Sequence, residues 1–237
     1  MEIKRSFDTE SLSSTKSKVI AAATHLFATK GMENVFLREL TSAAGVNLAA
    51  VNYHFGSKEA LCEAVLDSLS ERVNARRLAG LRQLLAAAEV KGKPPSLPAI
   101  LDTFVEPYLG PDEEGEGAVL LQLLIKDRIS RNEMTARIVR KHFDPLALEY
   151  IAAFAKACPQ VHPDDLYWRY TLMYGAVIMT ASDRSKSNRI ATMSMGRLDA
   201  SDPVALRQAV LDFLVPAISA PSRKPAAPGR KPAARRS

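Results

Sequence analysis

The stretch AGVNLAAVNYHFGSKEAL, at positions 44–61, places three polar side chains directly after a run of small apolar residues. These side chains are Asn52, Tyr53 and His54. An asparagine amide can pair with the N6 and N7 atoms of adenine, and tyrosine and histidine can hold phosphate oxygens. A helix N-terminus, such as the one that Ser57 would open, also attracts phosphate. These residue types therefore indicate a short helix that reads the major groove of DNA.

A reading helix needs neighbouring helices that hold it in position, and the flanking sequence predicts them. Apolar residues recur at helical spacing over 16–30, 37–44 and 48–54, and Gly45 separates the last two segments. Two short helices joined by a tight turn form a helix-turn-helix unit. The same pattern also fits an ordinary surface turn in a helical bundle, in which Asn52 would simply be solvated.

The third segment has two faces with different side chains. Val46, Val51 and Phe55 would pack against the preceding helices. The opposite face, with Leu48 and the alanines that follow it, is slim enough to enter a groove. The spacing therefore predicts which side of this helix is presented to DNA.

The remainder of the chain predicts helices and no strands. Ser57 is a suitable N-cap for a fourth helix that continues towards Leu85. Further helical patterns occupy 97–109, 117–130, 132–142, 145–157, 164–183 and 202–219. No run of alternating β-branched residues is present, so the predicted fold is all-α.

The bulk composition is that of a globular protein with a basic end. Of its 237 residues, 47% are hydrophobic and 24% are charged, and the net charge is +6. Residues 221–237 carry six positive charges and no acid, which accounts for the whole excess. Cys62 and Cys158 predict reduced thiols in a cytoplasmic protein. The sequence predicts no signal peptide and no membrane segment.

Enzymatic motifs are absent from the sequence. It contains no G-x-S-x-G, no P-loop and no G-x-G-x-x-G. The four histidines have no metal-ligand spacing. We therefore expect no enzyme activity, no catalytic residues, no cofactor and no metal site.

Residues 16–66 resemble the DNA-binding head of the TetR family of bacterial transcriptional regulators. The resemblance depends on VIAAATHLFATKGMENVFLRELTSAAGVNLAAVNYHFGSKEALCEAVL, in which several motifs match in order and spacing. The segment AGVNLAAVNYHFGSK is especially similar to the fatty-acid-responsive, PsrA-like repressors of that family. The later DDLYWRYTLMYGA resembles their second-last helix. This resemblance implies a DNA-binding repressor.

The resemblance also implies roles for individual residues in the head. It implies base contacts by Arg38, Leu48, Ala49 and Asn52, and phosphate contacts by Ala50, Tyr53, His54 and Lys58. The sequence departs from the family at Phe36, where a capping Ser or Thr is usual. Either Asn34 caps the second helix instead, or that helix starts without a tight cap.

For the C-terminal helices, the resemblance implies an apolar ligand pocket and a two-fold dimer interface. The ligand would be a small apolar molecule such as a long-chain fatty acid or an acyl-CoA. Candidate pocket residues are Phe104, Tyr108, Met134, Tyr150, Trp168, Arg169 and Met173. Candidate interface residues are Val177, Val204, Val210, Leu211 and Leu214. The Met and aromatic positions also fit plain core packing, and a structural salt bridge suits Arg169 better than a ligand contact.

The expected organisation therefore has four parts. Residues 1–11 form a flexible N-terminus, 12–58 a helix-turn-helix domain, 59–220 a ligand-binding and dimerisation domain, and 221–237 a disordered basic tail. We expect a homodimer that binds an inverted-repeat DNA operator. One alternative is a ligand-blind, nucleoid-type DNA binder that uses the tail. A more distant alternative is a helical enzyme or carrier for acyl groups.

Overall fold

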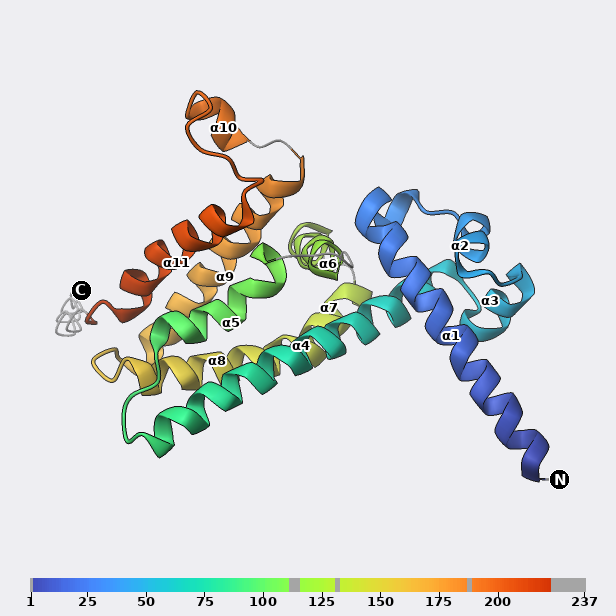
Figure 1. Ribbon diagram of the computed structural model, residues 1–237, viewed down its shortest axis with the longest axis horizontal. Coiled ribbons are helices and arrows are strands. Elements are labelled where there is room, and N and C mark those ends of the chain that lie inside the picture. Colours follow the sequence, from blue (N-terminus) through green and yellow to red (C-terminus); the bar gives the residue numbers. More distant parts are fainter. Residues whose placement is uncertain (1, 111–115, 131–132, 187–188, 223–237) are drawn as a thin grey trace, which may run out of the picture.

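Across its described residues the protein consists of helices and the loops between them (Figure 1). The computed structural model describes residues 2–110, 116–130, 133–186 and 189–222. The helices are α1 (Glu2–Lys30), α2 (Leu37–Ala44), α3 (Leu48–Phe55), α4 (Lys58–Val90), α5 (Leu97–Leu109), α6 (Glu116–Ser130), α7 (Glu133–His142), α8 (Asp144–Ala157), α9 (Pro163–Lys186), α10 (Arg189–Met193) and α11 (Pro203–Ser219), with a 3-10 turn at Met32–Asn34. The predicted all-α fold is confirmed.

Two groups of helices lie at opposite ends of the molecule, and the long helix α4 belongs to both (Figure 1). The first group, called the head below, consists of α1, α2, α3 and the start of α4. The second group, called the body, consists of the rest of α4 with α5–α9 and α11. In the body, α11 packs against α5 and α9, and α8 packs against α9.

One apolar core runs through the head and the body along α4. Leu61, Val65, Leu69, Val73 and Leu81 recur at helical spacing and are fully or almost fully buried. The first residues of this stripe belong to the part of α4 that packs against α1 and α3, and the last belong to the part that packs against α5 and α8. Burial of this stripe therefore holds both groups of helices on the same element.

Polar caps explain where several helices begin. The side chains of Asn47, Ser57, Ser96 and Asp202 each accept a hydrogen bond from a backbone N–H in the first turn of the following helix. These caps satisfy donors that have no intrahelical partner. Asp144, which resembles a cap in the sequence, is instead the first residue of α8.

Two segments differ from the expectation. Helix α1 begins at Glu2, so most of the N-terminal segment expected to be loose is helical. Extending an existing helix adds one hydrogen bond per residue without a new nucleation step, so the packed half of α1 supports this extension. The short helix α10 lies in the connection between α9 and α11, away from the body, and was not expected (Figure 1).

Some expectations concern residues that the structure does not describe, and others can be compared with the described residues alone. Most of the basic tail, 223–237, lies outside, so the expectation of a disordered tail stays a prediction. Cys62 and Cys158 are both buried and unbridged. No helix among the described residues is long and apolar enough to cross a membrane.

The head meets the body where α1 approaches α4 and α6. Glu116, the first residue of α6, forms ion pairs with Arg72 and Arg76 of α4. The Glu116 side chain is 8% exposed, and the distance from its Oε1 to Arg72 Nε is 2.9 Å. Gln122 of α6 adds a hydrogen bond of 3.1 Å to the carbonyl oxygen of Phe27 on α1. The contact between Gln122 and Phe27 connects the head to the body.

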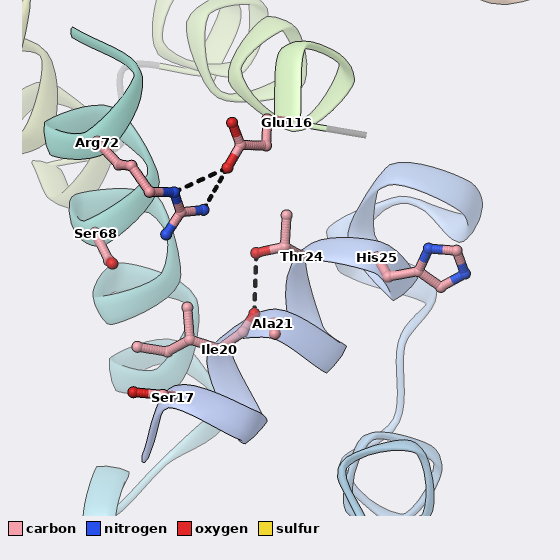
Figure 2. A pocket seen from close by; sticks show the side chains of 8 residues that line it. All are labelled: Ser17, Ile20, Ala21, Thr24, His25, Ser68, Arg72 and Glu116. Atoms are coloured by element: carbon pink, nitrogen blue, oxygen red, sulfur yellow. Dashed lines mark hydrogen bonds and ion pairs between the residues drawn. The ribbon is translucent and has the colours of Figure 1, made fainter. Parts of the chain in front are cut away.

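A partly open cleft of about 540 Å³ lies at this junction (Figure 2). Helix α1 lines it with Ser17, Ile20 and Thr24, and α4 lines it with Ser68 and Arg72. The paired carboxylate of α6 closes one side of the cleft. A movement of α6 relative to α4 would therefore change this ion pair and the shape of the cleft together.

Replacing Glu116 by Gln should destabilise the protein at neutral pH but not in acid. Burial opposes ionisation of Glu116, but the hydrogen bonds and charges of Arg76 and Arg72 outweigh it, so the pKa of this carboxyl is below its ordinary value. Stability from such a group is present above its unfolded pKa, about 4.3, and is lost as the pH falls through the folded value. Because both arginines are half exposed, we expect a loss of about 1 kcal/mol.

Thermal unfolding of both proteins between pH 3 and 8 measures this effect. At neutral pH the variant should melt about 2–4 °C lower, and the two curves should converge below about pH 4. Glu149→Gln is the control, because the carboxylate of Glu149 is exposed and its distance to Arg82 is 3.4 Å, which is long for an ion pair. A difference that persists unchanged at pH 3 would contradict the assignment of this stability to the ion pairs.

Candidate DNA-binding surface

The turn between α2 and α3 is built on Gly45. This residue has φ 65° and ψ 32°, a left-handed conformation that glycine adopts without steric cost. Its N–H donates to the carbonyl of Ser42, and the N–H of Val46 donates to that of Thr41 at 3.0 Å. Asn47 then caps α3 through a 2.7 Å hydrogen bond from the N–H of Ala50 to its Oδ1. The chain therefore turns sharply and starts α3 at a defined position.

The inner face of α3 is anchored in the core of the head. Val51 is 1% exposed and Phe55 is 9% exposed, and Val46 packs against the same core from the turn. Helix α3 contacts α1, α2 and α4 through this face. The predicted inward positions are confirmed, and they determine the rotation of α3 about its axis.

The outer face of α3 carries the residues expected to contact bases. Leu48 is 48% exposed, and Ala49 and Asn52 are exposed beside it. Positions three and four residues apart are neighbours on a helix, and Asn52 follows Ala49 by three and Leu48 by four, so the three residues form one surface around Asn52. Arg38 is exposed on the first turn of α2. The small side chain of Ala49 leaves room for a groove wall to approach.

The residues expected to contact phosphate have different surroundings. Tyr53 is 78% exposed, whereas His54 is half-buried with its ring edge-on to that of Tyr53 at 5.4 Å. Lys58 is half-buried, and its Nζ donates to the carbonyl oxygen of Glu33 at 3.3 Å. The backbone N–H of Ala50 donates to Asn47 Oδ1, so it is not free for a phosphate in this structure, and the expected phosphate contact of Ala50 stays a prediction.

The sequence allowed either a cap by Asn34 or an uncapped start for α2 at Phe36, and the structure decides between them. Asn34 does not cap α2, because its Nδ2 donates to the carbonyl oxygen of Lys30 at 2.8 Å and so closes the end of α1. Phe36 occupies the N-cap position without a side-chain hydrogen bond. Its ring is 74% exposed. Helix α2 therefore begins without a side-chain cap, next to the exposed Arg38.

The body brings together only some of the expected pocket residues. Phe104, Tyr108, Tyr150 and Met173 are buried, and the ring of Phe104 contacts those of both tyrosines edge-on. Met134 of α7 packs partly buried against the same core. The interior of the body is thus aromatic, as the sequence indicates.

Two of the expected pocket residues lie elsewhere. Trp168 is 72% exposed and faces away from the interior. The Nη1 of Arg169 donates to the carbonyl oxygens of Ile218 and Ala220, at 2.6 and 2.5 Å. Arg169 therefore caps the C-terminal end of α11, where the last carbonyls lack helical partners, rather than forming a salt bridge or meeting a ligand.

Most of the expected interface residues are buried within the single chain, and the expected interface stays a prediction. Val177, Val210 and Leu214 are at most 8% exposed in a single chain, so they belong to its own core. Leu211 is half-buried, and only Val204, at 76% exposed, lies fully on the surface.

The apolar surface of α9 and α11 is formed by other residues. It consists of Trp168, Leu172 and Met179 on α9 with Val204 and Phe213 on α11, each at least 64% exposed. We call these five residues the exposed apolar face. Four of them were not among the expected interface residues, although the spacing of four residues from Trp168 to Leu172 and of seven from Leu172 to Met179 places these three on one side of α9.

Comparisons with known proteins agree with this architecture. Residues 19–65 match the family described as "Bacterial regulatory proteins, tetR family", and residues 102–217 match "Tetracyclin repressor-like, C-terminal domain". The regulator TtgR of Pseudomonas putida is 36% identical over 62 residues, which are 26% of this chain and only 30% of that protein. The curated relatives are therefore matched over less than a third of their length.

Solved structures are similar over most of the chain. A protein from Saccharomonospora viridis, proposed to be a transcriptional regulator and solved with choline, has a TM-score of 0.67 and 18% identity and covers 85% of this chain and 96% of its own. The fatty acid degradation regulator FadR of Bacillus halodurans has a TM-score of 0.56 and 15% identity, with 84% and 93% covered. At these identities the similarity shows the fold.

Replacing Asn47 by Ala should loosen the start of α3. The loss of one N-cap should cost about 1 kcal/mol, or about 2–4 °C in melting temperature for a chain of this size. Circular dichroism during thermal unfolding measures this. Asn52→Ala is the matched control, because that exposed side chain lies on the outer face of the same helix. Equal melting of Asn47→Ala and wild type would show that the cap does not stabilise α3.

Proposed function

The chain belongs to the TetR family of bacterial transcriptional regulators, and from this premise we propose that it is a repressor that binds an inverted-repeat operator as a homodimer. A small, largely apolar ligand that enters the body would release it from DNA. Membership of the family establishes that the protein is a DNA-binding transcriptional regulator. The operator, the dimer and the ligand are what we propose.

The observation that supports the proposal most directly is the two-sided burial of α3. Val51 and Phe55 hold one side in the core, so Leu48, Ala49 and Asn52 are presented on the other. An exposed helix face that is slim and carries a hydrogen-bonding amide fits the major groove. In this proposal Asn52 pairs with an adenine, and the aliphatic side chains contact thymine methyl groups.

Other side chains of the head would add a base contact from α2 and phosphate contacts beside the reading helix. Arg38 is long enough to reach a guanine edge from α2, whereas Tyr53, His54 and Lys58 follow the reading face and suit phosphate oxygens. Lys58 already bonds to the carbonyl of Glu33, and that neutral acceptor can be exchanged for a charged phosphate. The phosphate contacts of Tyr53, His54 and Lys58 would set the register but carry no sequence information.

The exposed apolar face suits a second copy of the chain. A single soluble chain rarely exposes so many large apolar side chains on two neighbouring helices, and α9 and α11 pack against each other (Figure 1). Pairing these two helices with their copies gives a four-helix interface around a two-fold axis. Two reading helices would then meet successive half-sites about 34–36 Å apart.

The ligand would enter the aromatic interior of the body. Phe104, Tyr108, Tyr150 and Met173 come from three helices and enclose an interior that an apolar molecule can share. The B. halodurans neighbour is named as a fatty acid degradation regulator. For this chain, a fatty acid or acyl-CoA ligand is part of the proposal, and so is membership of the PsrA-like subgroup. Because α4 extends from this interior to the head, a ligand that moves α4 would shift the population towards a head spacing that no longer matches the operator.

The main alternative is a ligand-blind protein that binds DNA of any sequence through the head and the basic tail. Phosphate contacts alone would give it similar affinity for operator and random DNA, with a strong dependence on salt. The two proposals therefore differ in the effect of removing a base contact.

Asn52→Ala should weaken operator binding by about 1–3 kcal/mol and leave binding to random DNA nearly unchanged. The operator is first identified as an inverted repeat selected from a random DNA library by the wild-type protein. Fluorescence anisotropy with that site and with a scrambled duplex gives both affinities. Failure to select any repeat, or equal losses on the two duplexes, would favour the ligand-blind alternative.

Lys58→Ala provides the contrasting variant in the same assay. A lost phosphate contact should weaken both duplexes alike and reduce the slope of log affinity against log salt by about 1 per site. An unchanged slope would remove Lys58 from the phosphate contacts without affecting the assignment of Asn52.

Phe213→Asp should convert the dimer to a monomer that still folds. The Phe213 side chain is 64% exposed in the single chain, so its loss costs the protomer little, but the dimer would bury two unpaired carboxylates. We expect dimer affinity to fall at least about 100-fold and operator binding to fall with it. Light scattering after size exclusion, run beside the anisotropy assay, measures both.

Val90→Asp is the control for this variant, because Val90 is 88% exposed at the far end of α4 and away from the exposed apolar face. It should stay dimeric and keep its operator affinity. A soluble Phe213→Asp dimer with full operator affinity would show that the interface lies on other helices.

A further inference from the structure

A positive charge is buried at the centre of the body without a carboxylate beside it. Arg77 of α4 is 3% exposed. Its Nη1 donates to Asn74 Oδ1 at 3.2 Å, and its Nη2 donates to the carbonyl oxygen of Phe104 at 2.7 Å. Its Nε has no hydrogen-bond partner, and no described carboxylate forms an ion pair with it.

Packing alone explains only part of this arrangement. Arg77 donates to the carbonyl oxygen of Phe104 and so ties α4 to α5. A neutral side chain could do the same. A guanidinium has five N–H donors and a full charge, and two neutral acceptors leave most of that capacity unused. Buried charges are normally paired, because an uncompensated one is costly.

Aromatic rings surround the guanidinium from the other helices. Its central carbon lies 5.0 Å from the ring centre of Phe104 and 4.6 Å from that of Tyr108. Tyr150 and Tyr170 are close enough for Arg77 to influence their ionisation. The rings reduce the cost of the charge through cation–π contact but supply no negative charge.

The tyrosine hydroxyls around Arg77 are hydrogen-bond donors at any physiological pH. Burial raises the pKa of Tyr170 and of Tyr150 above the ordinary value, and the nearby Arg77 only partly offsets this. The Tyr150 hydroxyl lies 2.9 Å from Thr103 Oγ1. Thr103 Oγ1 donates its proton to the carbonyl oxygen of Ile100, so the Tyr150 hydroxyl already donates to Thr103. The guanidinium and the protonated hydroxyl of Tyr170 are therefore the donors that suit an anion.

We propose that Arg77 is the anchor for the acidic group of the ligand, and that the ligand is a monocarboxylate with an apolar body. This inference rests on the ligand-binding part of the proposed function. A carboxylate accepts two parallel hydrogen bonds from a guanidinium, which would use Nε and one Nη. The aromatic rings would then enclose the apolar part.

The charge balance selects this class of ligand over others. Arg77 is the one cation buried to this degree among the described residues, so it matches a single negative charge. The phosphates of a coenzyme A group carry several charges and would stay unpaired there. A quaternary ammonium ligand would be repelled by the same guanidinium. The geometry therefore favours a free acid over its coenzyme A ester.

Binding must open the cluster, which connects it to the head. The ring of Phe104 packs edge-on to Tyr150 at 5.2 Å and to Tyr170 at 5.9 Å, so a ligand has to displace rings of α5 from α9. Arg77 lies on α4, which begins at Lys58 next to the reading helix. Separation of α5 from α4 would act on the same helix that positions the head.

A thermal-shift experiment on the full-length protein tests the proposal with decanoate below its micellar concentration. Decan-1-ol and decyltrimethylammonium, which have the same chain with a neutral and a cationic head, are the matched probes. Decanoate should raise the melting temperature of the wild type in a concentration-dependent way, and the other two should do so much less. Equal shifts by acid and alcohol, or no shift by decanoate, would overturn the proposal.

Arg77→Met then tests the residue itself. Methionine has similar length and removes an uncompensated buried charge, so the unliganded variant should melt near the wild type or higher. Its affinity for decanoate should fall about 10- to 100-fold, to the level of decan-1-ol. Retained preference for the acid would overturn the assignment. If this variant does not fold, Tyr170→Phe serves instead: it should weaken decanoate but not decan-1-ol, and an unchanged preference would count against the site.

Operator binding is measured in parallel so that the two proposals can fail separately. A wild type that binds its operator but is not stabilised by decanoate would overturn this inference and leave the DNA-binding proposal standing. A protein that prefers decanoate through Arg77 but keeps its operator in the presence of the acid would support the anion site and contradict ligand release as the mode of regulation.

Discussion

The shared burial of one stripe along α4 is the constraint on which the rest of the structure depends. Leu61 and Val65 are buried in the head, and Val73 and Leu81 are buried in the body. Since a single continuous helix supplies both sets, neither group of helices can rotate about α4 without exposing apolar surface. The head and the body are therefore mechanically joined, and the ion pairs of Glu116 add a second, polar connection between α4 and α6.

Because the inner faces of the helices are held in the core, their outer faces point in defined directions. On α3, the anchoring of Val51 and Phe55 leaves the opposite face with a defined direction, and the Asn47 cap defines where that face begins. On α9 and α11, inward packing of Val177 and Leu214 leaves large apolar residues outside, including Trp168. One surface is slim and polar at its end, and the other is broad and apolar. Those properties suit a groove of DNA and a second protein chain, respectively.

The interior of the body has a different character, because it combines close packing with an unpaired charge. Edge-on aromatic contacts around Phe104 are the packing expected of a core. Arg77 at the centre of the same rings is not expected in a core. Rings and carbonyl oxygens stabilise a buried guanidinium less than a paired carboxylate would. A core that is stable but incompletely satisfied is well suited to a sensor, because a ligand that completes the hydrogen bonding can offset the cost of opening it.

The sequence by itself determined the helices, the turn at Gly45 and the two faces of α3, because these depend on local spacing, caps and glycine conformation. It also indicated an aromatic interior. The surroundings of Trp168, Val177 and Arg169 were decided only by the tertiary structure. Helix α9 is apolar on nearly all sides, so its pattern does not tell which side packs on α8 and α11 and which faces outward. Arg77 was missed for a related reason: an arginine in a polar-looking segment of α4 gives no local sign of burial, which arises only when α5, α8 and α9 close over it.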